Sequence, residues 1–105
     1  MKKTIMLVCA AGMSTSLMVN KMKKSAEEKG LDADIFAVSA SEADEYLSSR
    51  KIDVLLLGPQ VRFMKSQFET KVAPLGIKLG VINMTDYGMM KGEKVLEEAI
   101  RLMNS

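Results

Sequence analysis

A chain of 105 residues, 48% of them hydrophobic and 27% charged, has the size and composition of one folded domain, so we expect a single domain over residues 1–105. The 15 basic residues nearly balance the 13 acidic ones, which excludes the strongly basic surface that nucleic-acid binding requires. Histidine is absent and the acidic residues lack the spacing of a calcium loop, so we expect neither a metal site nor a bound cofactor.

Short apolar runs alternate with helical patterns in the first half of the chain. Residues 5–8 form an apolar run without alternation, which predicts a strand buried on both faces, as in parallel sheets. Apolar residues then recur at helical spacing over residues 17–26. A second strand is expected over residues 34–38 and a second helix over about residues 41–49, with one of the serines at 39 and 41 as its N-cap.

The second half of the chain repeats this order. A third strand is predicted over residues 52–57, followed by a turn and a helix over residues 61–72 that ends before Pro74. A fourth strand over residues 79–83 and a last helix over about residues 92–103 complete the pattern. The alternation predicts an α/β fold with an open four-stranded parallel sheet in the order 2-1-3-4 and helices on both faces. This is a flavodoxin-like, phosphatase-loop-like three-layer sandwich.

The single cysteine ends the first predicted strand, and a run of mostly small residues leads from it into the first helix. In the order 2-1-3-4 the carboxyl ends of strands 1 and 3 adjoin, so the turn after strand 3 is expected beside this cysteine. Backbone amides of the run, with the positive end of the helix, would form an anion site of about phosphate size and would favour a thiolate nucleophile. A buried and inert cysteine is the competing interpretation. We predict Cys9 as the catalytic nucleophile, and the predicted phosphate-binding residues are Ala10, Ala11, Gly12, Met13, Ser14, Thr15 and Ser16.

The composition of this loop separates several classes of phosphate chemistry. One glycine and no lysine exclude a Walker loop and a dinucleotide fingerprint. Small cysteine phosphatases carry an arginine six positions after the nucleophile, where this chain has Thr15. Without that guanidinium and without histidine, a phosphocysteine should persist as a relay intermediate instead of being hydrolysed. A small cysteine phosphatase or an arsenate-reductase-like enzyme is the alternative, and a non-catalytic anion-sensing module is the third possibility.

Further candidates lie near the same predicted edge of the sheet. Gln60 could help to order a phosphate, whereas turn formation alone explains Gly58 and Pro59. Tyr87 could hydrogen-bond near the site or simply pack. Flexible thioethers suit a surface that docks two different partners, which favours the methionines after Tyr87 as interface residues. The second-loop and interface candidates are Gly58, Pro59, Gln60, Tyr87, Met89 and Met90.

Three segments carry a resemblance to a known family: LVCAAGMSTSLMVNKM at residues 7–22, DVLLLGPQVRFM at 53–64 and YGMMKG at 87–92. The chain resembles the B components (EIIB) of the bacterial sugar phosphotransferase system (PTS), in the lactose, cellobiose and diacetylchitobiose branch. The resemblance implies a phosphoryl carrier whose cysteine, here Cys9, accepts phosphate from a phosphohistidine of an EIIA component. A membrane-embedded EIIC component then holds the sugar that receives it. Ala10 departs from the serine of the cellobiose-type relative.

The expected location follows from what the sequence lacks. A lone cysteine forms no disulfide within the chain, and no signal-peptide pattern follows Met1. No apolar segment approaches the roughly 18 residues that cross a bilayer. We therefore expect a cytoplasmic protein that associates with the membrane only peripherally, through EIIC.

Overall fold

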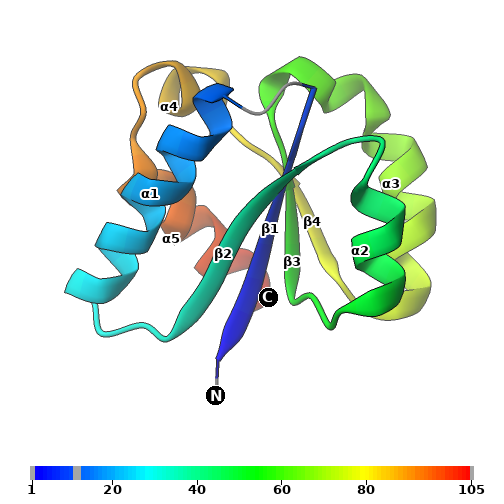
Figure 1. Ribbon diagram of the computed structural model, residues 1–105, viewed down its shortest axis with the longest axis horizontal. Coiled ribbons are helices and arrows are strands. Elements are labelled where there is room, and N and C mark those ends of the chain that lie inside the picture. Colours follow the sequence, from blue (N-terminus) through cyan, green and yellow to red (C-terminus); the bar gives the residue numbers. More distant parts are fainter. Residues whose placement is uncertain (1, 11–12, 105) are drawn as a thin grey trace.

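A parallel sheet forms the centre of the computed structural model, which describes residues 2–10 and 13–104 (Figure 1). The strand order is β2-β1-β3-β4, and all pairs are parallel. This confirms the predicted α/β fold with its order 2-1-3-4. The strands are β1 (Lys3–Cys9), β2 (Ala33–Ser39), β3 (Val54–Leu57) and β4 (Lys78–Val81).

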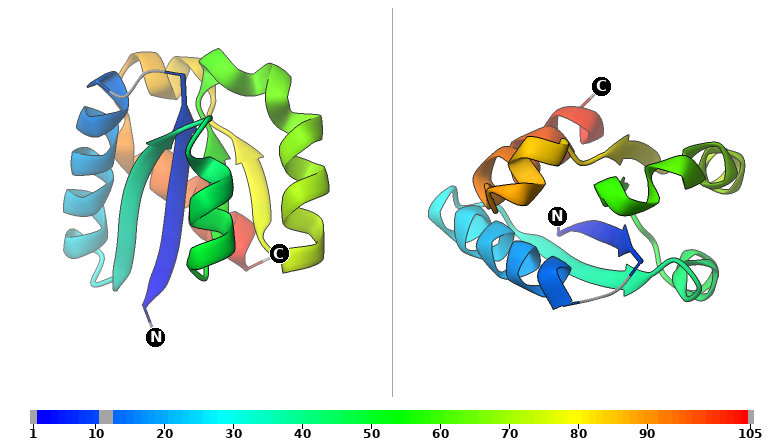
Figure 2. Two further views of the ribbon diagram at one scale, coloured as in Figure 1. Left: turned by 45° about the vertical axis from the view of Figure 1, so that its right-hand side comes forward. Right: turned by 90° about the horizontal axis from the view of Figure 1, so that it is seen from above.

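Helices cover both faces of the sheet, as the two views of Figure 2 show. One face carries α1 (Met13–Glu28) and α5 (Gly92–Met103), and the other carries α2 (Ala43–Ser49) and α3 (Lys65–Val72). Two 3-10 segments, η1 (Pro59–Met64) and η2 (Ala73–Leu75), flank α3, and a short helix α4 (Met84–Gly88) follows β4. No helix in the described ranges is both long and apolar enough to cross a membrane.

The central strand β1 explains the unbroken apolar run near the start of the chain. Ile5 and Leu7 pack into the core beneath α1 and α5, whereas Met6 and Val8 pack beneath α2 and α3. All four side chains have no exposed surface. Because helices cover both faces of this part of the strand, no position over residues 5–8 is open to a polar side chain.

The start of α2 differs from its prediction by two residues. The amide of Glu42 donates to the carbonyl oxygen of Ser39 over 3.0 Å, and the Glu42 carboxylate accepts from the hydroxyl of Ser39 over 2.9 Å. These bonds close a turn over residues 39–42, so α2 begins only at Ala43. No serine side chain caps α2, because Glu42 occupies the N-cap without a side-chain hydrogen bond.

Two further elements differ from prediction between residues 59 and 88. The expected helix over residues 61–72 is divided into η1 and α3 at Met64, where ψ is 5°, and Val61 within η1 also has a non-helical φ of −118°. The fourth strand ends at Val81 instead of residue 83, and α4 follows, which the sequence analysis did not predict. Asn83 caps α4, since its Oδ1 accepts from the amides of Thr85 (2.8 Å) and Asp86 (3.1 Å).

Candidate functional site

Cys9 is the last residue of β1 and is held on one side by β2. It pairs with Ser39 in the strand register, and its carbonyl oxygen accepts from the amide of Ala40 over 3.0 Å. The side chain is 2% exposed, and its thiol donates to the carbonyl oxygen of Val38 with Sγ 3.7 Å away. In this arrangement the sulfur faces the backbone of β2.

The turn after β3 holds Cys9 on its other side. The amide of Gly58 donates to the carbonyl oxygen of Val8 over 2.8 Å. A Cβ atom placed on Gly58 would lie 3.8 Å from Cβ of Cys9 and 2.9 Å from Oε1 of Gln60. The Gln60 side chain therefore folds back over Gly58, which itself lies against Cys9. The strand order thus brings the residues predicted from the second loop next to the predicted nucleophile.

The predicted phosphate loop connects Cys9 with the start of α1. Ala10 is exposed, Ala11 and Gly12 lie outside the described residues, and Met13 to Ser16 form the first turn of α1. Because Met13 is four residues after Cys9, their Cα atoms are at most roughly 14 Å apart, and the amino-terminal end of α1 is held near the cysteine. A helix of this length carries unpaired amides and a partial positive charge at that end. The ring of amides around the sulfur stays a prediction.

Three of the interface candidates lie together in the structure. Pro59, Gln60 and Tyr87 line one hollow of about 440 Å³, together with Met84 and Gly88 of α4. Tyr87 is buried at 7% exposure and joins the core beneath α1 and α5, so it packs there.

Met89 and Met90 were predicted as a pair, but the structure places them differently. Met89 is 63% exposed, whereas Met90 is half-buried and packs against the core. Met90 has a φ of +54°, which reverses the chain between α4 and α5. Met84, at 58% exposure, is a surface methionine of α4 that the sequence analysis did not assign to the site. Asn83, directly before Met84, is a typical helix-capping residue and was the sequence signal for a helix at this position.

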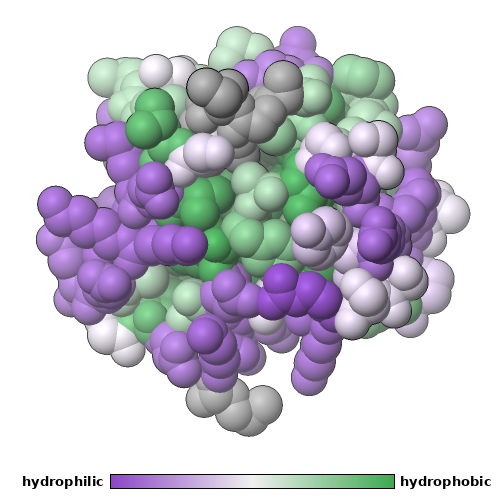
Figure 3. All heavy atoms as spheres, viewed as in Figure 1, coloured by the Kyte–Doolittle hydropathy of each residue, from purple (hydrophilic) through white to green (hydrophobic). Residues whose placement is uncertain are grey.

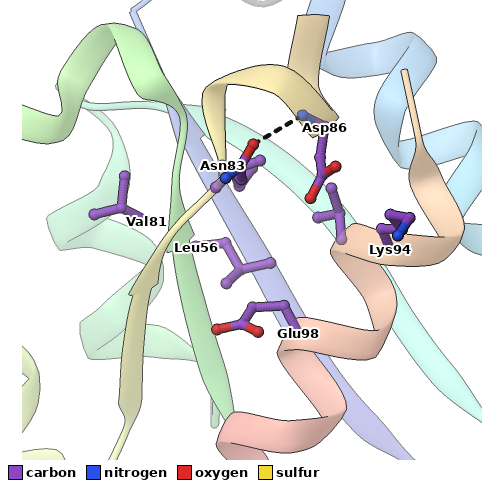
Figure 4. A pocket seen from close by; sticks show the side chains of 8 residues that line it. Leu56, Val81, Asn83, Asp86, Lys94 and Glu98 are labelled. Atoms are coloured by element: carbon purple, nitrogen blue, oxygen red, sulfur yellow. Dashed lines mark hydrogen bonds between the residues drawn. The ribbon is translucent and has the colours of Figure 1, made fainter. Parts of the chain in front are cut away.

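A separate hollow of about 340 Å³ lies between β4, α4 and α5 (Figure 4). Asp86, Lys94 and Glu98 contribute charged groups to it. Hydrogen bonding to the Arg101 guanidinium lowers the pKa of Glu98. None of the predicted site residues lines this hollow. Within residues 2–10 and 13–104, no three His, Cys, Asp or Glu side chains are grouped as a metal site would require.

Sequence similarity places this geometry in a known protein family. The family described as "PTS system, Lactose/Cellobiose specific IIB subunit" matches residues 4–98, a range that includes Cys9 and the facing turn. This chain belongs to that family. As a IIB (EIIB) subunit it is a phosphotransferase component of a sugar transport system of the cellobiose and lactose class.

Individual relatives agree with this assignment over almost the whole length of the IIB subunit. A galactose-specific EIIB component from Lactococcus lactis subsp. cremoris (strain MG1363) is 55% identical over 97% of both chains. A cellobiose-specific EIIB component from Lactococcus lactis subsp. lactis (strain IL1403) is 54% identical over 97% of both. The solution structure of a cellobiose-specific IIB component from Borrelia burgdorferi has a TM-score of 0.79 at 43% identity, covering 99% of this chain and 94% of that one. Relatives named for different sugars are thus about equally similar to this chain.

Proposed function

We propose that this IIB subunit carries a phosphoryl group on Sγ of Cys9, between a phosphohistidine of an EIIA component and a sugar bound by a membrane EIIC component. The observation that carries the proposal is the position of Cys9. It ends the central strand β1, between Ser39 of β2 and the turn that begins at Gly58, and α1 is the next element in the chain. Ligands of open α/β sheets bind at such a point, outside the carboxyl ends of adjacent strands.

Two balanced transfers make up the proposed reaction. In the first, Sγ attacks phosphorus, an S–P bond forms, the N–P bond of the phosphohistidine breaks, and the thiol proton leaves with the imidazole. In the second, a sugar hydroxyl oxygen attacks phosphorus, the S–P bond breaks, and the hydroxyl proton restores the thiol. Amides of residues 10–16 would hold the non-transferred oxygens and stabilise their charge. The side-chain amide of Gln60, which folds over Gly58 next to Cys9, would contribute a further donor.

The burial of the sulfur adds a step to this reaction. With 2% exposure and a hydrogen bond to Val38, the thiol cannot meet an incoming phosphohistidine where it lies. Docking of EIIA must therefore be accompanied by rotation of the Cys9 side chain away from Val38 toward the loop. The cost is the loss of one weak sulfur hydrogen bond, which the new contacts to phosphate oxygens would offset.

We further propose that the subunit works in the cytoplasm and reaches the membrane through EIIC. The sugar would be of the cellobiose, lactose or chitobiose class and would bind EIIC instead of this chain.

Intact-mass measurement tests the relay. The full chain is incubated with phosphoenolpyruvate, the general phosphotransferase proteins and an EIIA component. We expect one added phosphoryl group that persists for minutes in the wild type and is absent in Cys9→Ser. Circular dichroism of the variant shows whether it is folded. Rapid release of inorganic phosphate without an adduct would indicate the phosphatase alternative, and no reaction with any donor would overturn the proposal.

A further inference from the structure

The first residue of α5 lies directly on the backbone of α1. A Cβ atom on Gly92 would be 2.6 Å from Cβ of Lys21 and 2.9 Å from the amide nitrogen of Met22. Figures 1 and 2 show the two helices side by side on one face of the sheet. The positive end of α5 is therefore brought against the middle of α1. No side chain caps α5, since its N-cap Lys91 makes no side-chain hydrogen bond.

A hollow of about 450 Å³ opens where the two helices meet, and its rim is basic. The α1 side contributes Lys21 and Lys24, and the α5 side contributes Lys91 and Lys94. No ion pair to these four lysines occurs among the described residues. Figure 3 shows hydrophilic side chains gathered over α1. The remaining lining residues are Ser25, Glu28, Met90, Gly92 and Glu93, so the two carboxylates leave an excess of positive charge.

Ser25 gives this hollow a polar group that the fold itself does not use. The residue is 5% exposed, and its Oγ has no hydrogen-bond partner. It lies one helical turn after Lys21, on the face of α1 that α5 approaches. Buried hydroxyl groups are nearly always hydrogen-bonded, so an unpaired one that lines a basic hollow indicates a ligand that would accept a hydrogen bond from it.

We propose that this hollow binds the phosphate group of a small phosphomonoester, at a site separate from Cys9. A tetrahedral dianion accepts several hydrogen bonds at once, which suits the Ser25 hydroxyl, the uncapped first turn of α5 and the surrounding ammonium groups. A lipid headgroup shares this chemistry, and the experiment distinguishes the two sources. The site does not depend on the proposed phosphoryl transfer and is tested in its absence.

Chemical shifts of backbone amides locate binding directly. The 15N-labelled full chain is titrated with inorganic phosphate and with a hexose 6-phosphate, at an ionic strength held constant with potassium chloride. We expect saturable shifts at the amides of Ser25, Gly92 and Glu93. Lys24→Gln should weaken the binding about three- to fivefold, and Ser25→Ala about tenfold. Ser25→Ala should leave the stability equal or higher, because it removes an unpaired hydroxyl.

Lys23→Gln is the matched control, since it removes the same charge from the adjacent position of α1 but Lys23 lines a different hollow. Its binding should equal that of the wild type. Equal weakening by Lys23→Gln and Lys24→Gln, or shifts that chloride alone reproduces, would overturn the site. Sedimentation with vesicles of phosphatidic acid, whose headgroup is a phosphomonoester, lost in Lys24→Gln and combined with no saturable shift from either soluble anion, would assign the phosphate group to a lipid. No shift and no sedimentation would also overturn the site.

Discussion

The amide of Gly58 donates to the carbonyl oxygen of Val8 over 2.8 Å, which joins the turn after β3 to the end of β1. Gly58 has φ of −64° and ψ of 154°, a conformation open to any L-residue. Space, and not backbone conformation, therefore explains glycine here. The Gln60 side chain occupies the volume that a Cβ atom on Gly58 would need.

Gly58→Ala should consequently affect the transfer more than the fold. The new methyl group would displace Oε1 of Gln60, which lies at the end of a flexible side chain, and would make an ordinary contact with the Val8 carbonyl oxygen at 3.4 Å. We expect the free energy of unfolding to fall by at most about 1 kcal/mol, while phosphorylation by EIIA slows severalfold. Urea denaturation and the rate of adduct formation measure the two effects.

Gly88→Ala is the control for this prediction. A Cβ atom on Gly88 would meet nothing within 4 Å, and alanine favours the helix in which Gly88 lies by about 0.5–1 kcal/mol. Its stability should be equal or higher, and its phosphorylation rate should change less than that of Gly58→Ala, because the added methyl group displaces no side chain beside Cys9. If Gly58→Ala phosphorylates as fast as Gly88→Ala, the packing of Gln60 beside Cys9 has no role in the transfer.

Sequence patterns predicted the helices and strands correctly wherever the local periodicity of apolar residues agrees with their burial. The bounds predicted for α5 match the structure, because Val95, Leu96 and Ala99 recur at helical spacing and all three are buried. The continuous apolar run of β1 was equally informative. The strand order followed from the need to cover both faces of the sheet, and it placed Gly58 beside Cys9.

Features that depend on tertiary contacts were missed. The five residues of α4 are too few for a helical period, and their helix depends on the Asn83 cap. Met90 is half-buried because it contacts core residues that are distant in the sequence. The local sequence does not show these contacts, so Met90 was given the same interface role as Met89. The direction of the Cys9 sulfur, toward Val38, is likewise set by the neighbouring strand.

Met89 tests whether the exposed apolar surface after α4 docks the phosphoryl donor. Its side chain is 63% exposed and follows the helix that borders Gln60. Met89→Ser should raise the KM for phosphorylated EIIA severalfold and leave the free energy of unfolding nearly unchanged, because little buried area is lost. Leu75→Ser is the matched control, since Leu75 is 55% exposed but lies in η2, before β4. Equal KM values for both variants would exclude Met89 from the interface.

Asn83 tests the contribution of α4 to the site. Asn83→Ala removes the acceptor of the Thr85 and Asp86 amides, and loss of such a cap costs about 1 kcal/mol. The expected result is a lower urea midpoint and slower phosphorylation, since α4 positions Tyr87 and Met84 beside Gln60. Asn83→Asp retains an acceptor and should restore most of both. Loss of stability in Asn83→Asp equal to that in Asn83→Ala would show that the cap is not responsible.

The Glu98–Arg101 pair on α5 predicts a pH dependence of stability. Nε of Arg101 donates to Oε2 of Glu98 over 3.0 Å, and this bond lowers the pKa of Glu98 below its ordinary value of 4.5. A carboxyl group whose pKa is lower in the folded state stabilises the fold above its unfolded pKa, and this stabilisation is lost as the pH falls through the folded pKa. Glu98→Gln should therefore lower the urea midpoint slightly at pH 7 and leave it unchanged near pH 2. Because both groups are exposed, high salt should reduce the difference at pH 7. In an Arg101→Gln background, the Glu98→Gln substitution should leave the urea midpoint unchanged at both pH values. If the midpoint still falls at pH 7 in that background, the pH dependence arises from another partner of Glu98.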